Sequence, residues 1–201
     1  PLSLGIETMG GAVAKLVTKG RAVPCVAEEV FSTYVDGQTN IKIHVLQGER
    51  ELVKDCRSLG QFVLAGIPPM PAGLPKLKVK FLVDASGVLN VSATEERSGT
   101  KASLQILPSY GLTRDEVARM VKESVTFARQ DMLEHRLIDL RNQITLDTAA
   151  IRKSLAIMGT DLDPAYRTDL EGQITRLETL ATGYDADAIH TALTALDKAS
   201  T

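Results

Sequence analysis

The chain has 201 residues, with 23 Lys and Arg against 25 Asp and Glu, and a formal net charge of −2. Hydrophobic residues make up 44% and charged residues 24%, which is typical of a globular protein and excludes wholesale disorder. The balanced charge disfavours a nucleic-acid-binding protein. With 4% aromatic residues and no Trp, the chain has little material for stacking bases or sugars. No stretch approaches the roughly 20 apolar residues that span a bilayer, so no membrane partner is expected.

The cysteine content indicates a cellular compartment, and the first residue indicates whether the chain is a fragment. Cys25 and Cys56 are too few for a disulfide framework, which favours a reducing compartment and predicts a cytoplasmic protein. The chain begins at Pro1 rather than Met, and its first residues do not have the pattern expected of a signal peptide. We therefore expect it to be a fragment.

The composition changes near residue 108. Seven of the eight Pro and 11 of the 15 Gly lie in residues 1–108. Frequent Pro and Gly are typical of short strands and turns, and their near absence afterwards is typical of long helices. The sequence therefore predicts an α+β fold, with a β-sandwich over residues 1–108 and a helical subdomain over 109–201.

Strands are predicted where apolar and polar residues alternate, most clearly in Ile41–Val45 and Leu77–Phe81, and less cleanly in Val88–Ala93. Pairs typical of hairpin turns separate such runs: Asp36-Gly37, Ser86-Gly87 and Ser98-Gly99. About eight strands are expected by these signals. An antiparallel sandwich accommodates them.

The helical part begins with a capping box at Thr113–Glu116. No Gly or Pro interrupts residues 112–158, so we expect one or two helices there. A straight helix of that length would measure roughly 70 Å, longer than a small sandwich is wide, so we expect either a bend or a helix that projects beyond the sandwich. Asp163-Pro164 and Asp185 are typical N-terminal caps of two further helices. The last three helical segments are predicted to form a small antiparallel bundle.

No catalytic or metal-binding pattern emerges from the residues. The chain lacks a phosphate-binding loop, and its three His are far apart in the sequence. His44 is predicted to be a solvated residue of a polar strand face, and Glu95-Glu96 to be solvated strand or turn charges. Two classes remain open: a peptide- or protein-binding module, and a hydrolase or carbohydrate module on a β-sandwich. A structural spacer is a weaker third.

Several segments resemble the substrate-binding region of the 70-kDa heat-shock chaperones, the DnaK-like family. The matching segments are Pro1–Gly11, Val30–Thr33, Ile43–Arg50, Ser58–Phe62, Asp84–Ala93 and Tyr110–Leu112. The resemblance is dense over residues 1–125 and looser over the later helices. It implies a chaperone whose β-sandwich holds a short extended apolar peptide of an unfolded client, with a helical lid closing over it. It also implies that the chain's own ATPase domain lies outside this fragment, so that ATP and Mg bind there and no cofactor or ATPase activity is expected here.

Carried over position by position, the resemblance assigns a peptide-binding set. Its members are Ile6, Thr8, Met9, Ala12, Phe31, Ser32, Tyr34, Ile41, Ile43 and Leu77. Met9 and Tyr34 are expected to form an arch over the peptide, and Lys19 and Pro24 to contact the ATPase domain. DnaK has Val at positions 12 and 41 and Ala at position 34, so the pocket shape and the arch are expected to differ.

Within the family, three segments look like the HscA-type branch: Asp55–Leu59, Pro71–Gly73 and Pro108–Leu112. An aromatic residue at position 34 points the same way. That branch serves iron–sulfur cluster assembly, which implies an iron–sulfur scaffold protein as client and a J-domain co-chaperone. A general DnaK-type chaperone for unfolded proteins is the alternative.

Overall fold

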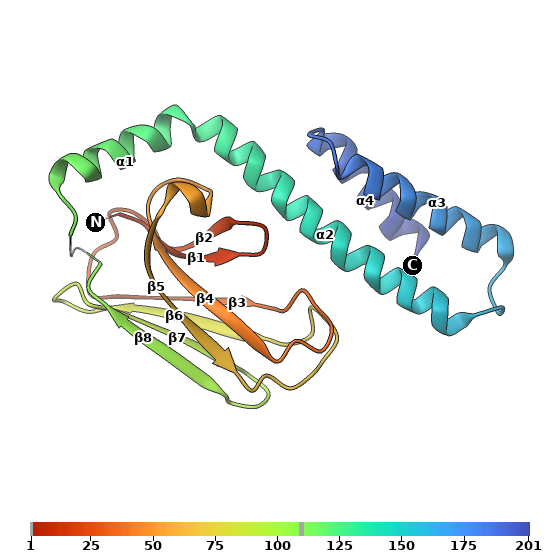
Figure 1. Cartoon of the computed structure of the whole chain (residues 1–201), viewed down its shortest axis with the longest axis horizontal. Helices are drawn as coiled ribbons and strands as arrows, with labels where there is room; N and C mark the ends of the chain where they lie inside the picture. The colour runs from red at the N-terminus through yellow and green to blue at the C-terminus, as the bar shows by residue number, and fades with distance from the viewer. Residues whose placement is uncertain (1, 109–110) are drawn as a thin grey trace. The chain divides into compact units, whose positions relative to one another are not determined.

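The computed structural model describes residues 2–108 and 111–201 (Figure 1). Within them, eight strands precede four α-helices, which confirms the predicted α+β fold. Pro1 of the first matching segment, and Ser109 and Tyr110 at the predicted boundary, lie outside the described residues. The chain divides into two compact units, residues 1–132 and 133–201.

The strands form two antiparallel four-stranded sheets in the first unit. The first sheet has the order β2-β1-β4-β5 and comprises β1 (Leu4–Thr8), β2 (Ala12–Val17), β4 (Asn40–Gln47) and β5 (Arg57–Ala65). The second has the order β3-β6-β7-β8 and comprises β3 (Cys25–Phe31), β6 (Leu77–Val83), β7 (Leu89–Glu95) and β8 (Lys101–Ile106). A short 3₁₀ helix, Val53–Asp55, precedes β5.

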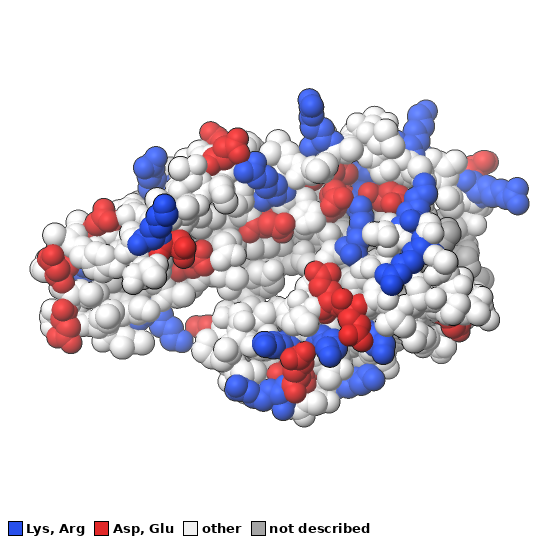
Figure 2. All heavy atoms as spheres, turned by 180° about the vertical axis from the view of Figure 1, so that it is seen from behind, with Lys and Arg blue, Asp and Glu red and all other residues white. Residues whose placement is uncertain are grey.

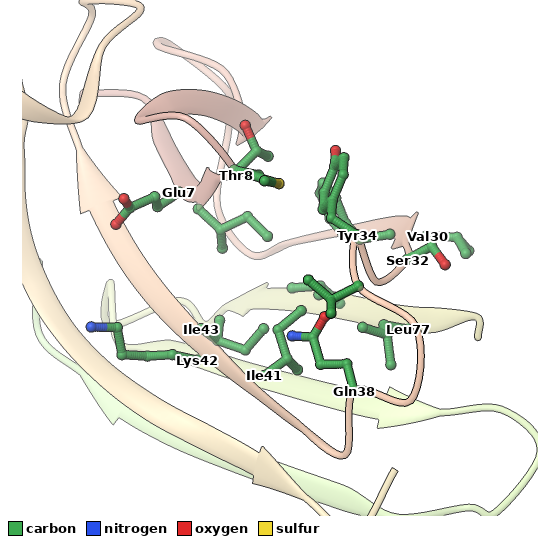
Figure 3. Close-up of a pocket in the computed structure, with 15 residues that line it drawn as sticks. Glu7, Thr8, Val30, Ser32, Tyr34, Gln38, Ile41, Lys42, Ile43 and Leu77 are labelled. Atoms are coloured by element: carbon green, nitrogen blue, oxygen red, sulfur yellow. The ribbon is translucent and has the colours of Figure 1, made fainter. Parts of the chain in front are cut away.

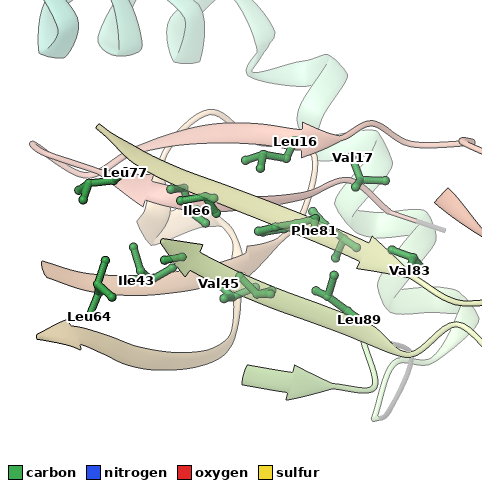
Figure 4. Packing of buried hydrophobic residues seen from close by; sticks show 14 of the residues in the cluster. Ile6, Leu16, Val17, Ile43, Val45, Leu64, Leu77, Phe81, Val83 and Leu89 are labelled. Atoms are coloured by element: carbon green, nitrogen blue, oxygen red, sulfur yellow. The ribbon is translucent and has the colours of Figure 1, made fainter. Parts of the chain in front are cut away.

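The core of the first unit lies between these two sheets, as Figure 4 shows. In β6, the apolar residues Leu77, Val79 and Phe81 are fully buried, while Lys78 and Lys80 between them are not. The observed alternation is the predicted one, because successive side chains of a strand point to opposite faces. Ile6, Ile43, Val45 and Leu64 of the first sheet supply the facing layer.

Two of the three predicted hairpin turns are hairpins. Ser86-Gly87 joins β6 to β7 and Ser98-Gly99 joins β7 to β8, and both pairs of strands are hydrogen-bonded neighbours. The prediction for Asp36-Gly37 is wrong, because it lies between β3 and β4, which belong to different sheets. Gly37 still has a φ of 71°. Local turn chemistry sets the backbone conformation, but it does not decide which strands pair.

The turn between β7 and β8 also corrects the prediction for Glu95. Its side chain is buried rather than solvated, with only 1% of the residue exposed. Its carboxylate accepts hydrogen bonds from the Ser98 amide and hydroxyl, at 2.6 Å each, and from the Arg97 amide at 3.1 Å. These bonds, above all the one from the Ser98 hydroxyl, hold the pKa of Glu95 below its usual value. Glu96 is exposed as predicted.

The first unit also contains α1 (Arg114–Thr126) and the start of α2 (Ala128–Met158). The capping box is confirmed: the Glu116 amide donates to the Thr113 hydroxyl, and the Thr113 amide donates to the Glu116 carboxylate. Of the alternatives left open for the long helical stretch, two helices are observed, and Phe127 separates α1 from α2.

The second unit consists of the rest of α2 with α3 (Pro164–Leu180) and α4 (Ala186–Ala199). Both predicted caps are confirmed, since the Asp163 and Asp185 side chains accept from first-turn amides of α3 and α4. The apolar faces of the three helices meet in one core, whose most buried members are Leu137, Ile174, Leu177, Ile189 and Leu196. None of the helices in the described parts of the chain is long and apolar enough to cross a membrane.

Candidate functional site

A pocket of about 560 Å³ opens at one end of the sandwich (Figure 3). Nine of the ten predicted peptide-binding residues line it: Ile6, Thr8, Met9, Phe31, Ser32, Tyr34, Ile41, Ile43 and Leu77. Glu7, Val30, Val35, Gln38, Lys42 and Val79 complete the lining. Residues from both sheets and from the β3–β4 connection therefore come together around one cavity.

The floor of the pocket is continuous with the core. Ile6 from β1, Ile43 from β4 and Leu77 from β6 are buried and belong to the core cluster, while Phe31 and Ile41 pack against that cluster. Phe31 lies directly opposite Leu77 across the β3–β6 pair. A floor of aliphatic and aromatic carbon can take up an apolar side chain and offers no group for acid or base chemistry.

The rim of the pocket comes from two connections. Met9, 42% exposed, begins the β1–β2 turn, where Gly10 and Gly11 have φ values of 90° and 83° that glycine adopts without strain. Tyr34 stands in the β3–β4 connection, and Figure 3 shows its side chain rising beside the opening. The Ser32 hydroxyl donates to the Pro75 carbonyl oxygen at 2.6 Å, which ties this connection to the segment before β6.

The remaining predicted site residues lie elsewhere. Ala12 is completely buried on β2, where it forms an isolated bridge with Leu52, and it is not among the residues that line the pocket. Lys19 and Pro24 are exposed in the β2–β3 connection, and the Val23–Pro24 peptide bond is cis. The predicted contact of Lys19 and Pro24 with an ATPase domain stays a prediction.

His44 is not solvated as predicted, because only 12% of its side chain is exposed. Its Nδ1 lies 2.6 Å from the Glu7 carboxylate and its Nε2 lies 2.8 Å from the Ser58 hydroxyl. The three residues come from neighbouring strands β1, β4 and β5, so this contact depends on strand register, which alternation alone does not specify. Of the three, only Glu7 lines the pocket.

A buried ion pair that the sequence did not reveal fastens α2 to the sandwich within the first unit. Arg50, in the β4–β5 connection, donates from Nε and Nη2 to the two Asp131 carboxylate oxygens, at 2.5 and 3.0 Å. The Asp131 side chain is 3% exposed and that of Arg50 is 12% exposed. Asp55 lies 3.3 Å from the same guanidinium, which also lies over the Phe127 ring at 4.4 Å.

The charge pair shifts both pKa values. The hydrogen bond from Arg50 holds the pKa of Asp131 below its usual value, and the same bond raises the pKa of Arg50. The partners are 81 residues apart in the sequence. Arg50 ends the matching segment Ile43–Arg50, but nothing in the spacing points to Asp131 as its partner.

No group of three His, Cys, Asp or Glu among the described residues could hold a metal ion. Both cysteines are free thiols, and burial raises the pKa of Cys56 to about 11, which makes it a poor thiolate ligand or nucleophile at neutral pH. Basic and acidic side chains are interspersed on the face in Figure 2, in keeping with the balanced composition. The pocket is therefore the strongest candidate site.

Comparison with known proteins matches the whole chain to one family. The family model described as "Hsp70 protein" matches residues 1–201. "Chaperone protein HscA homolog" of Tolumonas auensis is 45% identical over 201 residues, which are 100% of this chain and 33% of the relative. "Chaperone protein HscA" of Escherichia coli is 44% identical over 198 residues, 98% of this chain and 32% of the relative. The chain thus spans about a third of the length of these curated relatives.

Proposed function

We propose that this chain is the client-binding part of a chaperone. The chain belongs to the Hsp70 family of chaperones and is HscA-like, and the proposal proceeds from that. In this proposal the pocket takes one aliphatic side chain of an extended client segment. The rim connections that carry Met9 and Tyr34 enclose the client backbone.

The observation that carries the proposal is the pocket itself. Its volume of about 560 Å³ lies within the range of ordinary ligand pockets, about 300–1,000 Å³. Its floor is apolar, while Thr8, Ser32 and Gln38 place polar groups along its lining. An extended peptide presents both kinds of surface, since its side chains alternate with unpaired main-chain donors and acceptors.

Side-chain burial alone cannot hold a client tightly. Burying one Val, Leu or Ile side chain stabilises a complex by about 1.5–3 kcal/mol, whereas micromolar binding requires about 8 kcal/mol. Main-chain hydrogen bonds, and a structure that covers more of the client segment, must supply the remaining binding free energy. We infer that the helical part serves as a lid for this reason, and that the Arg50–Asp131 pair anchors its first part to the sandwich.

The finer role that we propose is iron–sulfur cluster assembly, with an iron–sulfur scaffold protein as client and a J-domain co-chaperone as partner. Support comes from the segments Asp55–Leu59 and Pro71–Gly73 and from the similarity to the two HscA relatives over nearly the whole chain. ATP and Mg would bind in an ATPase domain of the longer protein, and Lys19 and Pro24 would face that domain.

A peptide array tests the proposal. Overlapping peptides from unfolded proteins and from iron–sulfur scaffold proteins would be probed with the purified chain, and hits would be measured by fluorescence anisotropy. We expect saturable binding of extended apolar peptides, concentrated in one short scaffold motif. Broad binding without that motif would favour the general DnaK-type role. Binding of oligosaccharides instead of apolar peptides would contradict the proposal.

A further inference from the structure

The pocket carries its charge at one end. Glu7 and Lys42 are the only Lys, Arg, Asp or Glu among its fifteen described lining residues. Glu7 contacts His44, and Lys42 stands two residues from His44 on β4, so strand alternation places Lys42 on the same sheet face as Glu7. Figure 3 shows the charged ends of Glu7 and Lys42 on the same side, away from Leu77 and Val30.

These two charges differ in how free they are to meet a ligand. The Glu7 carboxylate is held 2.6 Å from Nδ1 of His44, whose other ring nitrogen is fixed by Ser58. Within residues 2–108 and 111–201, the Lys42 ammonium group has no ion pair or side-chain hydrogen bond. Its cross-strand neighbour is Val63, which is apolar and half exposed. Of the two charges, Lys42 is therefore the one that no side chain of the described residues pairs with.

We propose that Lys42 makes the pocket select client segments that carry a carboxylate beside the apolar residue. This inference rests on the proposed peptide-binding function and narrows its substrate class to extended apolar peptides with an acidic residue on one side. A peptide in extended form advances about 3.3 Å per residue, so the flexible Lys42 side chain reaches a carboxylate about two or three residues from the buried side chain. An exposed ion pair changes affinity by at most about fivefold.

The position of the charges predicts a directional preference. Because Glu7 and Lys42 share one end, a carboxylate is favoured on one side of the apolar residue and not on the other. A basic residue at the same place would instead pair with the Glu7 carboxylate, which contacts His44 through one of its two oxygens and whose side chain is 36% exposed. Preference for a basic client residue is therefore the opposing outcome.

Fluorescence anisotropy with labelled peptides tests this inference on the whole 201-residue chain. Each peptide has a central leucine and a glutamate, glutamine or lysine about three residues before or after it. We expect the glutamate peptide to bind about threefold more tightly than its glutamine twin at one of the two positions, with the ratio falling as ionic strength rises. Lys42→Gln should bring the ratio to one.

Lys80→Gln is the matched control, because it removes the same charge from the second sheet, where Lys80 lies 3.7 Å from Glu28 and outside the pocket. It should keep the wild-type ratio. A wild-type ratio of one, tighter binding of the lysine peptide, an unchanged ratio in Lys42→Gln, or equal loss in Lys80→Gln would each overturn the inference. If all peptides bind without discrimination, only the selectivity is wrong. If none binds, the proposed function itself fails.

Discussion

Ile41 illustrates how one residue serves both packing and the candidate site. It packs against the core between the sheets and also lines the pocket. Its backbone pairs with Leu64 on β5, within a ladder that runs along β4 from Asn40 to Gln47. A larger side chain at this position can therefore fill the pocket while the strand stays in register.

We expect Ile41→Phe to abolish peptide binding while the sandwich still folds. The added ring would occupy the space meant for the client side chain, at an overpacking cost of about 1–3 kcal/mol. Anisotropy titrations would be read together with thermal unfolding. Val63→Phe is the control, since Val63 is next to this site on β5 but outside the pocket. Peptide affinity within threefold of wild type in a folded Ile41→Phe variant would refute the assignment.

Glu95 shows that a charged residue in a turn can be a structural centre. Glu95→Gln should lower the free energy of unfolding by about 1–3 kcal/mol, because the buried carboxylate loses charge-assisted bonds from Arg97 and Ser98. Glu96→Gln, at the exposed neighbouring position, should change it little. Since the folded-state pKa of Glu95 is lowered, the stabilisation is present above the carboxyl's unfolded-state pKa and is lost as pH falls through the folded-state value. The free energies of unfolding of wild type and Glu95→Gln would be measured with urea from neutral to acidic pH. A difference between the two that stays constant over this range would show that the account is wrong.

Among the elements, the junction of α1 and α2 depends most on one contact. The chain turns at Phe127, and four residues later Asp131 meets Arg50 from the β4–β5 connection. Phe127 lies against the same guanidinium. The helix start is thus held by an aromatic contact and a bidentate ion pair from a single Arg, and loosening that Arg releases both.

Asp131→Asn should destabilise the packing of this junction by about 1–3 kcal/mol. Removing one partner of a buried pair costs about 3–5 kcal/mol, but Asp55 remains near Arg50 and offsets part of the loss. Hydrogen exchange would show faster exchange at the start of α2. Glu178→Gln, which breaks an exposed pair with Arg152, should cost less than about 1 kcal/mol. Equal effects of the two variants would show that the buried pair stabilises the protein no more than an exposed pair does.

At the scale of the whole molecule, the described residues form two separate cores. One lies between the sheets and contains Phe81 and Leu89, and the other lies among α2, α3 and α4 and contains Ile174 and Leu177. Each core is built from residues of its own unit. Because buried apolar contacts determine which parts of a protein unfold together, the two units can open independently.

Leu177→Ala should therefore destabilise residues 133–201 by about 2–5 kcal/mol and leave the first unit protected. Leu89→Ala, at an equally buried position of the sandwich core, should have the reverse pattern. Hydrogen exchange measured by mass spectrometry separates the two units. Loss of protection in both units from either substitution would mean that the chain unfolds as one cooperative body.

The sequence by itself determined the α+β class, the alternating strands, the helix caps at Thr113, Asp163 and Asp185, and membership of the chaperone family. These features depend on residues close together in the chain, or on matches read one position at a time. Nine pocket residues were also named from the resemblance, and their meeting around one cavity is a result of the structure.

Only the tertiary structure decided which distant groups meet. Arg50 pairs with Asp131 across 81 residues, His44 is held between Glu7 and Ser58 from two other strands, and Asp36-Gly37 connects two sheets instead of closing a hairpin. Each depends on strand register or on packing between elements, and neither has a local signature. The charged end of the pocket follows from the same register: Glu7 contacts His44, and Lys42 pairs with no side chain of the described residues. Side-chain alternation fixes the face on which a residue lies, but not its neighbours on that face.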